Sequence, residues 1–291
     1  MTAPRVDKLA HIADLHFWEI VCNPLRLLNK RFLGNANVVL RRAREFPMDR
    51  AESFADTVAA TGAATAVLTG DFTSTATDRE FELAKRFVEG LARRGLRVWA
   101  IPGNHDVYTY EAARKRRFER YLGDFLPKEG LPASVPLPGG TPLVLVPTVC
   151  PNFLSARGRI TEDEVARTAA LIEAAPEGPV IVAGHYPCLH QTDGYASTWG
   201  RRLRNADTLR NVLGRAGRPI LYLAGHVHRF SCASDTLHAT LCHVTTPAFF
   251  LDCRHDGTRG AFTEVHAGAE GFAVFRHAFR DNWSREQVLG A

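Results

Sequence analysis

The stretch Ile101-Pro102-Gly103-Asn104-His105-Asp106 decides the fold of this chain. It follows the apolar run of residues 96–100, which predicts a buried strand. Pro102 and Gly103 end that strand and begin a turn. An amide, an imidazole and a carboxylate then follow one another at the carboxyl end of the strand, where ligands collect in open α/β sheets. The stretch therefore predicts an α/β protein with a ligand site at this edge.

Four further apolar runs end in the same kinds of polar group. They lead into Asp14-Leu15-His16, Gly70-Asp71, Gly184-His185 and Gly225-His226-Val227-His228. Strands aligned in one parallel sheet would bring all five ends to the same edge. Each motif alone suits an ordinary turn or helix cap, but their joint occurrence after five strands predicts a metal site. Carboxylate, amide and imidazole ligands together suit Mn²⁺, Fe or Zn²⁺, and their number predicts two ions.

Predicted helices alternate with these strands. Two capping boxes mark helix starts, at Thr77 with Glu80 and at Thr161 with Glu164. Apolar spacing predicts further helices over residues 48–62 and 206–215, and a very basic helix is expected over 109–122. The segment 123–141 is rich in proline and glycine and predicts a loop, whereas strands are expected over 238–246, 260–266 and 271–279. Without an internal repeat or a low-complexity linker, one domain is expected over residues 1–291.

Composition narrows the class of protein and its partners. The chain has 291 residues, of which 45% are hydrophobic, and this is sufficient for a sizeable core. Its net charge of +5 suits an anionic substrate but argues only weakly for nucleic acid. Six scattered cysteines without a Cys-x-x-Cys pair favour a reducing cytoplasm. The first residues lack an apolar signal core, and no apolar run reaches the roughly 20 residues that span a bilayer, so a cytoplasmic protein is expected.

The five motifs, in this order, resemble the signature of the calcineurin-like metallophosphoesterase superfamily. That signature reads Asp-x-His, Gly-Asp, Gly-Asn-His-Asp/Glu, Gly-His and Gly-His-x-His, and here it spans residues 14–228. The resemblance implies a four-layer α/β/β/α sandwich, with two mixed sheets flanked by helices. It also implies phosphoester hydrolysis by a hydroxide that bridges two divalent metal ions.

The resemblance also implies a role for each motif residue. One metal would be held by Asp14, His16, Asp71 and His228. The other would be held by Asp71, Asn104, His185 and His226, so that Asp71 bridges the two. His105 would lie beside the metals and donate a proton to the leaving oxygen. Asp106 joins His105 as a catalytic candidate, either with a direct role or with a structural one as a helix cap or a group that orients His105.

Differences between this chain and other branches of the superfamily narrow the range of expected substrates. Phosphoprotein phosphatases carry a further Asp-Arg pair after the Gly-Asp block, and this chain continues instead with Phe72-Thr73-Ser74-Thr75-Ala76. The pattern is closer to the bacterial phosphodiesterase branch, which includes class III cyclic-nucleotide phosphodiesterases. A small phosphorylated substrate with a phosphodiester or pyrophosphate bond is therefore expected. Its phosphate could meet Arg157, which stands in a segment that resembles a loop of that branch, and further substrate-side candidates are His190, Arg229 and His255.

A basic, apolar insert over about residues 20–47 follows the first motif. Leu25, Leu28 and Phe32 predict a helical face in it, and a second basic group follows at Arg41, Arg42 and Arg44. The insert is either a packed helical excursion with a solvated basic face, or a cap that rests on an anionic membrane surface or holds acyl chains.

The second interpretation of the insert suits a nucleotide–lipid pyrophosphatase of the UDP-2,3-diacylglucosamine type, placed peripherally at the inner membrane face. Two other functions remain as alternatives. A nuclease would suit the basic charge, but the chain has no nucleic-acid module. A non-catalytic scaffold on the same fold would not need the full set of ligand positions that stands here. The oligomeric state is left open by the sequence.

Overall fold

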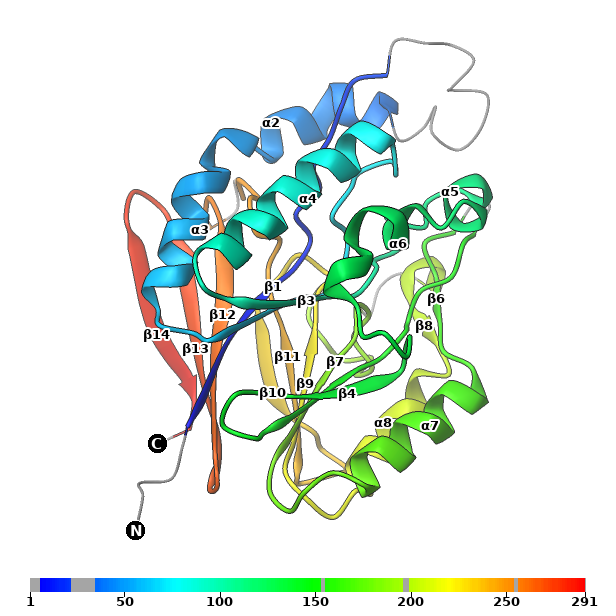
Figure 1. Cartoon of the computed structure of the whole chain (residues 1–291), viewed down its shortest axis with the longest axis vertical. Coiled ribbons are helices and arrows are strands. Elements are labelled where there is room, and N and C mark those ends of the chain that lie inside the picture. Colours follow the sequence, from blue (N-terminus) through cyan, green and yellow to red (C-terminus); the bar gives the residue numbers. More distant parts are fainter. Residues whose placement is uncertain (1–5, 22–34, 153–154, 196–198, 254–255, 291) are drawn as a thin grey trace.

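The computed structural model describes residues 6–21, 35–152, 155–195, 199–253 and 256–290. The predicted helical face of the insert and His255 lie outside these residues. Two six-stranded mixed sheets are stacked, with helices on their outer faces (Figure 1). The predicted fold class, two mixed sheets flanked by helices, is confirmed.

The first sheet has the strand order β14-β13-β12-β1-β2-β3. Its first three strands in the sequence run parallel, and the C-terminal three are antiparallel. The strands are β1 (Asp7–Ile12), β2 (Thr65–Leu68), β3 (Arg97–Ala100), β12 (Ala261–Gly268), β13 (Gly271–Phe279) and β14 (Trp283–Leu289). The helices of this half are α2 (Ala43–Glu45), α3 (Ala51–Ala60), α4 (Asp78–Arg93), α5 (Tyr110–Arg114) and α6 (Arg117–Leu122), with η2 (Val38–Arg42), η3 (Met48–Arg50) and η4 (Gly123–Phe125).

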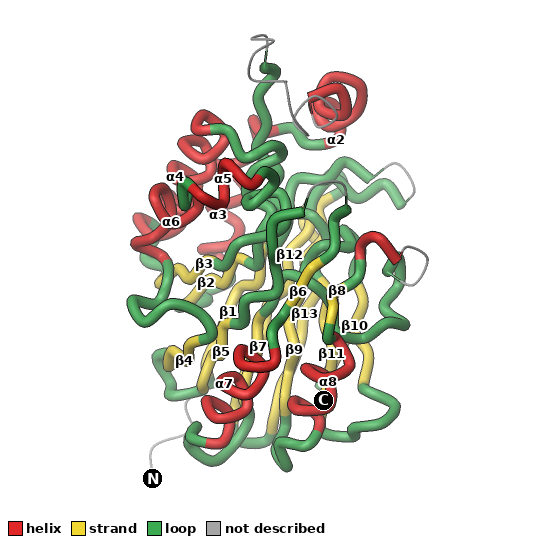
Figure 2. Tube along the Cα trace, turned by 90° about the vertical axis from the view of Figure 1, so that its right-hand side faces the viewer, coloured by secondary structure: helices red, strands yellow, loops and turns green. Residues whose placement is uncertain are grey.

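The second sheet has the order β10-β11-β9-β7-β5-β4, and its central strands run parallel. The strands are β4 (Ala133–Pro136), β5 (Pro142–Leu145), β7 (Val180–Ala183), β9 (Ile220–Ala224), β10 (Ser231–Ser234) and β11 (Leu241–Thr245). Helices α7 (Glu162–Glu173) and α8 (Ala206–Gly214) cover its outer face (Figure 2). The short strands β6 (Gly158–Arg159) and β8 (Leu203–Arg204) pair with each other, and η5 (Trp199–Arg201) precedes β8.

Three hydrophobic layers explain why the strands read as continuous apolar runs. In β1, Leu9 faces the second sheet, whereas Ala10 and Ile12 face the helices. A strand covered on both faces needs apolar side chains at every position rather than at alternate ones. The buried strands therefore form the contact between the two sheets, and the polar motif residues lie beyond the strand ends.

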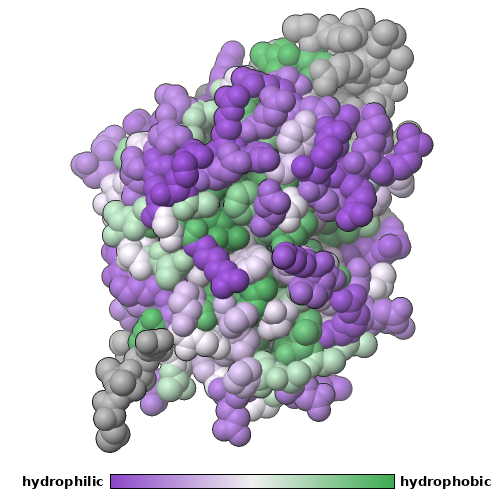
Figure 3. Space-filling view, in the orientation of Figure 1, coloured by the Kyte–Doolittle hydropathy of each residue, from purple (hydrophilic) through white to green (hydrophobic). Residues whose placement is uncertain are grey.

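Local signals in the sequence place several elements correctly. Both predicted capping boxes are present, at the starts of α4 and α7. The predicted helix over residues 109–122 is instead two helices, because Arg116 has a left-handed backbone (φ 47°). That break turns Arg117 inward, where it donates to the Ala76 carbonyl at 3.0 Å and pairs with Glu111 at 3.2 Å. Hydrophilic side chains cover much of the surface over these helices (Figure 3).

The other differences concern strands. The predicted loop 123–141 contains β4, a short edge strand of alternating burial that pairs antiparallel with β5. Pro136 is tolerated there because an edge strand has one unpaired side. The polar edge strands β10 and β14 give no apolar run in the sequence and were not predicted. Among the described residues, no helix is long and apolar enough to cross a membrane.

Candidate metal centre

All five motifs lie at the carboxyl ends of their strands, but these strands belong to two sheets. The first sheet contributes the ends of β1, β2 and β3, and the second contributes the ends of β7 and β9. The side chains delivered are Asp14 and His16, then Asp71, then Asn104 with His105, then His185, and finally His226 with His228. The sequence argument from one parallel sheet was wrong. The ends converge because two stacked sheets present the same edge side by side.

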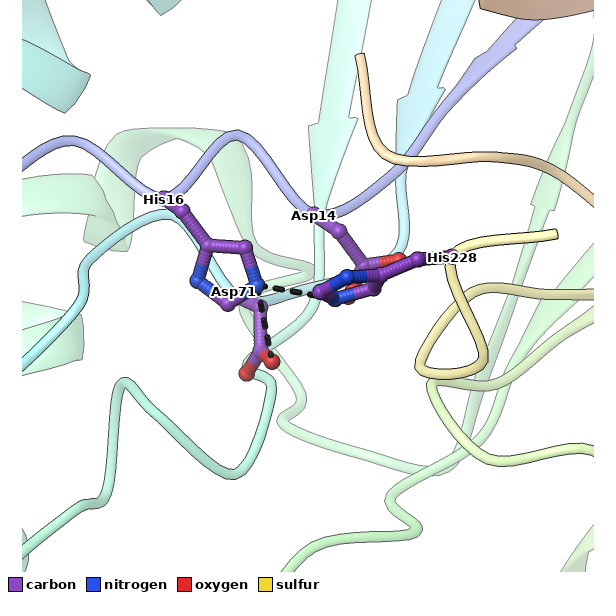
Figure 4. Close-up of side chains that lie close together, drawn as sticks. All are labelled: Asp14, His16, Asp71 and His228. Atoms are coloured by element: carbon purple, nitrogen blue, oxygen red, sulfur yellow. Dashed lines mark hydrogen bonds and ion pairs between the residues drawn. The ribbon is translucent and has the colours of Figure 1, made fainter. Parts of the chain in front are cut away.

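The first group of side chains comprises Asp14, His16, Asp71 and His228, whose ligand atoms all lie within 4.8 Å of one another (Figure 4). His16 Nε2 lies 3.0 Å from His228 Nε2 and 3.7 Å from Asp71 Oδ2. His228 Nε2 lies 3.6 Å from Asp14 Oδ1. Two imidazole nitrogens and two carboxylates directed at one point form the donor set of a divalent cation.

The second group comprises Asp71, His185 and His226, again within 4.8 Å. The Asn104 Oδ1 atom belongs with them, because it lies 3.1 Å from His185 Nε2 and 3.0 Å from His226 Nδ1. Asp71 is common to both groups, with Oδ1 3.5 Å from His185 Nε2 and Oδ2 toward His16. The structure thus brings together all seven residues that the sequence proposed as metal ligands.

Hydrogen bonding shows that these residues fit cations. Asp14 Oδ2 accepts from the His226 backbone N–H at 2.9 Å, but the buried Oδ1 atom has no hydrogen-bond partner among the described residues. A buried carboxylate oxygen without a partner is costly, and a cation would satisfy it. The ring contacts of His185 Nδ1 with the Thr69 carbonyl (2.7 Å) and of His226 Nε2 with the Arg201 carbonyl (3.0 Å) assign the ring protons to those atoms. The other nitrogen of each ring therefore faces the group with a lone pair.

The pKa values of the histidines in the centre also favour metal binding. Burial lowers the pKa of His185, and it lowers the pKa values of His16 and His226 well below 6.5, so these imidazoles are neutral. Neutral imidazole is the form that ligates metals. Burial, followed by the charge of Asp14, raises the pKa of Asp71 to about 8, because two carboxylates share a dry site. A divalent cation between them would reverse that shift.

The backbone of the centre is strained. Left-handed φ angles occur at five of the seven proposed ligands, namely Asp14 (54°), His16 (50°), Asp71 (56°), His226 (69°) and His228 (57°). Each such residue costs about 1–2 kcal/mol, and strain of this kind gathers at functional sites. A Cβ atom on Gly103 would lie 2.1 Å from Asp71 N, and one on Gly225 would lie 2.5 Å from Asp14 Oδ2. The motif glycines therefore allow the ligand loops to approach one another.

His105 and Asp106 occupy different positions. The His105 backbone N–H donates to Asp71 Oδ1 at 2.7 Å, and its Nδ1 donates to the Ser74 carbonyl at 2.7 Å. Asp106 is buried and accepts from the backbone N–H groups of Gly103 (2.8 Å) and Thr73 (3.0 Å). It does not cap a helix, because Thr109 caps α5. Asp106 therefore ties the loop after β3 to the loop after β2, which makes it a positioning residue.

A cavity of about 500 Å³ opens onto the metal groups. Arg229 lines its rim, where the side chain is 59% exposed and pairs with Asp193 at 3.1 Å. The two other substrate candidates that the structure describes do not line it: His190 lies 3.9 Å from Asp207, and Arg157 lies outside the lining. Arg42 lines the cavity and was not proposed as a site residue, although the sequence marked it as part of a basic group. The described residues that line a larger hollow of about 620 Å³ beside α7 and α8 include no histidine or cysteine.

A family model described as calcineurin-like phosphoesterase matches residues 7–230. This chain belongs to the calcineurin-like phosphoesterase family. The matched region includes both ligand groups and every motif that carried the resemblance. The superfamily assignment is thereby confirmed, and membership of the bacterial phosphodiesterase branch stays a prediction.

Solved structures share the fold of this phosphoesterase. A dimetal phosphatase from Danio rerio gives a TM-score of 0.61 at 14% identity, with 97% of this chain and 99% of that chain covered. Purple acid phosphatase from yellow lupin seeds gives 0.60 at 10% identity, with coverage of 97% and 54%. A 5'-nucleotidase from Candida albicans gives 0.51 at 13% identity, with coverage of 97% and 50%. At these identities the likeness shows the fold alone, and no curated protein matches the chain.

Proposed function

We propose that this phosphoesterase hydrolyses a phosphodiester or pyrophosphate bond of a small substrate, with two divalent ions chosen from Mn, Fe and Zn. The observation that carries the proposal is the shared Asp71, which stands between two ligand groups, one of them containing the unpartnered Asp14 Oδ1. When bound, the ions would neutralise phosphoryl charge and lower the pKa of water for attack on phosphorus. The ligands would be Asp14, His16, Asp71, Asn104, His185, His226 and His228.

His105 is the residue that would handle the leaving oxygen. Its Nδ1–H donates to the Ser74 carbonyl and fixes the ring, and Nε2, which lies 3.1 Å from Arg42 Nη2, is the atom that would carry a proton to the substrate. His105 also lines the cavity, so a bound phosphoryl group lies within reach. Asp106 contributes indirectly, since its hydrogen bonds hold the turn that presents Asn104 and His105.

The shape of the site supports a substrate with two substituents on phosphorus. A second cavity of about 240 Å³ adjoins the first, and the two share His228, Arg229, Leu251 and Cys253 in their linings. A phosphomonoester needs room on one side of the reacting group, whereas a diester or a pyrophosphate needs it on both.

The test combines metal analysis with a substrate panel. The purified chain is loaded with Mn²⁺, its metal content is measured, and kcat/KM is determined for bis(p-nitrophenyl) phosphate, cyclic nucleotides, nucleotide–lipids and p-nitrophenyl phosphate. We expect two ions per chain and a preference for the diesters or pyrophosphates. A preference for the monoester would contradict the bond type, and a metal-loaded chain without hydrolysis would support the scaffold alternative.

One observation favours the nucleotide–lipid pyrophosphatase as a second candidate. Leu40 is 75% exposed and belongs to the described part of the insert, two residues before the cavity-lining Arg42. Ile20, at the start of the insert, is 50% exposed. Exposed apolar side chains in a basic segment suit contact with an anionic lipid surface. Co-sedimentation with anionic liposomes should then depend on Leu40, and a wild-type chain that stays in the supernatant would contradict this candidate.

A further inference from the structure

Arg42 places a cation inside the cavity that opens onto the metal groups. It ends the π-helical turn η2, a rare conformation that is frequent at functional sites. Its Nη1 atom lies 2.9 Å from His16 Nδ1, and its Nη2 atom lies 3.1 Å from His105 Nε2. The guanidinium group therefore lies between a proposed metal ligand and the proposed proton donor.

The partners of Arg42 are unusual for a partly buried arginine. Arg210 forms two hydrogen bonds with the Asp235 carboxylate, and Arg117 pairs with Glu111. Arg42, in contrast, forms an ion pair with no carboxylate among the residues that the structure describes, and its contacts are the imidazole rings of His16 and His105. Removing a cation from water without a paired carboxylate is costly, and the charge of Asp71, which lies beyond ion-pair contact, offsets that cost only in part, because burial still lowers the pKa of Arg42. An anion bound in the cavity would supply the remaining counter-charge.

The contact with His16 also depends on which ring nitrogen carries the proton. Arginine only donates, so the 2.9 Å contact requires a lone pair on His16 Nδ1. A His16 ring that ligates through Nε2 carries its proton on Nδ1 and turns it toward the Thr73 carbonyl, which lies 3.4 Å away. In that form His16 no longer accepts from Arg42, and Nη1 becomes available to another acceptor in the cavity.

We propose that Arg42 binds the non-bridging oxygens of the substrate phosphoryl group. The planar fork of a guanidinium matches two phosphoryl oxygens, and its position beside His105 puts it next to the leaving oxygen. The phosphate-binding arginine thus comes from the insert, and the segment that contains Arg157 does not supply it. This inference rests on the proposed function, and it names the residue that selects the anionic group of the substrate.

The experiment compares Arg42→Met and Arg42→Lys with the control Arg44→Met. Arg44 is exposed, stands two residues away in the same segment and does not line the cavity. Inorganic phosphate is titrated calorimetrically into each Mn²⁺-loaded protein, and metal content and thermal midpoint are measured in parallel. We expect Arg42→Met to weaken phosphate binding about 10- to 100-fold. Arg42→Lys should retain part of the affinity, and Arg44→Met should retain all of it, with metal content unchanged in each.

Three outcomes would overturn the inference. They are wild-type phosphate affinity in Arg42→Met, a parallel loss of metal and phosphate in that variant, and the absence of phosphate binding by the wild-type protein. The proposed function fails by a different result, in which the loaded wild-type chain binds phosphate but hydrolyses none of the diesters. Phosphate binding does not require turnover, so the two failures are distinguishable.

Discussion

Two buried clusters of this protein contain the same kinds of side chain but differ in whether the chain itself satisfies the carboxylate oxygens. Asp235 accepts two hydrogen bonds from Arg210, at 2.6 and 2.7 Å, one from His243 at 2.8 Å and one from the Leu237 backbone at 2.8 Å. Both of its oxygens are satisfied by the chain itself. Asp14, in the metal centre, keeps one buried oxygen without a partner. The difference teaches that an excess of lone pairs, rather than the residue types, marks a cation site.

The pKa values of Asp235 and of Asp71, the carboxylate shared by both ligand groups, move in opposite directions. Burial alone would raise the pKa of Asp235, but the hydrogen bonds from Arg210 and His243 outweigh burial and hold that pKa far below its ordinary range. Burial raises the pKa of Asp71 to about 8, and the nearby Asp14 adds to the shift. The Asp235 cluster contains its own cation, whereas the metal centre needs one from solution.

The largest expected effect is the loss of activity on changing Asp71→Asn. Because Asp71 belongs to both ligand groups, this change should lower metal content and reduce kcat/KM by more than about 100-fold, which exceeds the loss typical of outer-shell partners. Elemental analysis and steady-state kinetics measure the two quantities. Asp235→Asn is the matched control and should retain its metal. An Asp71→Asn variant with wild-type activity would end the metal assignment.

For the free energy of unfolding, the order should be reversed, with the larger loss expected in the Asp235 cluster. Asp235→Asn leaves Arg210 buried without its carboxylate, so the free energy of unfolding should fall by about 3–5 kcal/mol. Asp14→Asn, measured without metal, should cost much less, because the Asn oxygen can still accept from the His226 backbone N–H and the other position, Oδ1, has no hydrogen bond to lose. Urea denaturation of both variants in EDTA measures the contrast. Equal losses would show that Asp14 is as internally compensated as Asp235.

The stabilisation that added Mn²⁺ gives should also differ between variants of the two clusters, but by a smaller amount. Mn²⁺ at about 100 times its dissociation constant should stabilise the wild-type protein by about 2.7 kcal/mol. Asp14→Asn should lose most of this increase, whereas Asp235→Asn should show the full increase from its lower starting point. Thermal midpoints with Mn²⁺ and with EDTA provide the comparison. An increase that survives in Asp14→Asn would place the ion elsewhere.

The smallest expected effect is a dependence of the unfolding free energy on pH in the acid range. A carboxyl whose folded pKa is depressed stabilises the protein above its ordinary value of 3.8 and loses that contribution as the pH falls. The difference in unfolding free energy between the wild type and Asp235→Asn should therefore narrow below about pH 4. Asp281→Asn is the control, because this aspartate side chain is 90% exposed. A difference that stays constant to pH 3 would show that the Asp235 pKa is not depressed.

The sequence by itself determined five apolar runs with polar ends, and the resemblance of these motifs to the metallophosphoesterase signature implied the fold class and all seven candidate ligands. The motifs could be recognised because each one closely follows a buried strand, and an apolar run with a polar end is a local pattern. The helix starts at Thr77 and Thr161 were predictable for the same reason, since a capping box involves residues three apart.

Only the tertiary structure decided how these pieces meet. The five strand ends come from two stacked sheets, and no local pattern states which sheet a strand joins. Arg42 reaches His105 across 63 positions of the sequence, so its place in the cavity depends on how the insert folds over the site. The unpartnered oxygen of Asp14 is also a property of the assembled site. Whether a buried charge is satisfied depends on every neighbour around it, and those neighbours are distant in the chain.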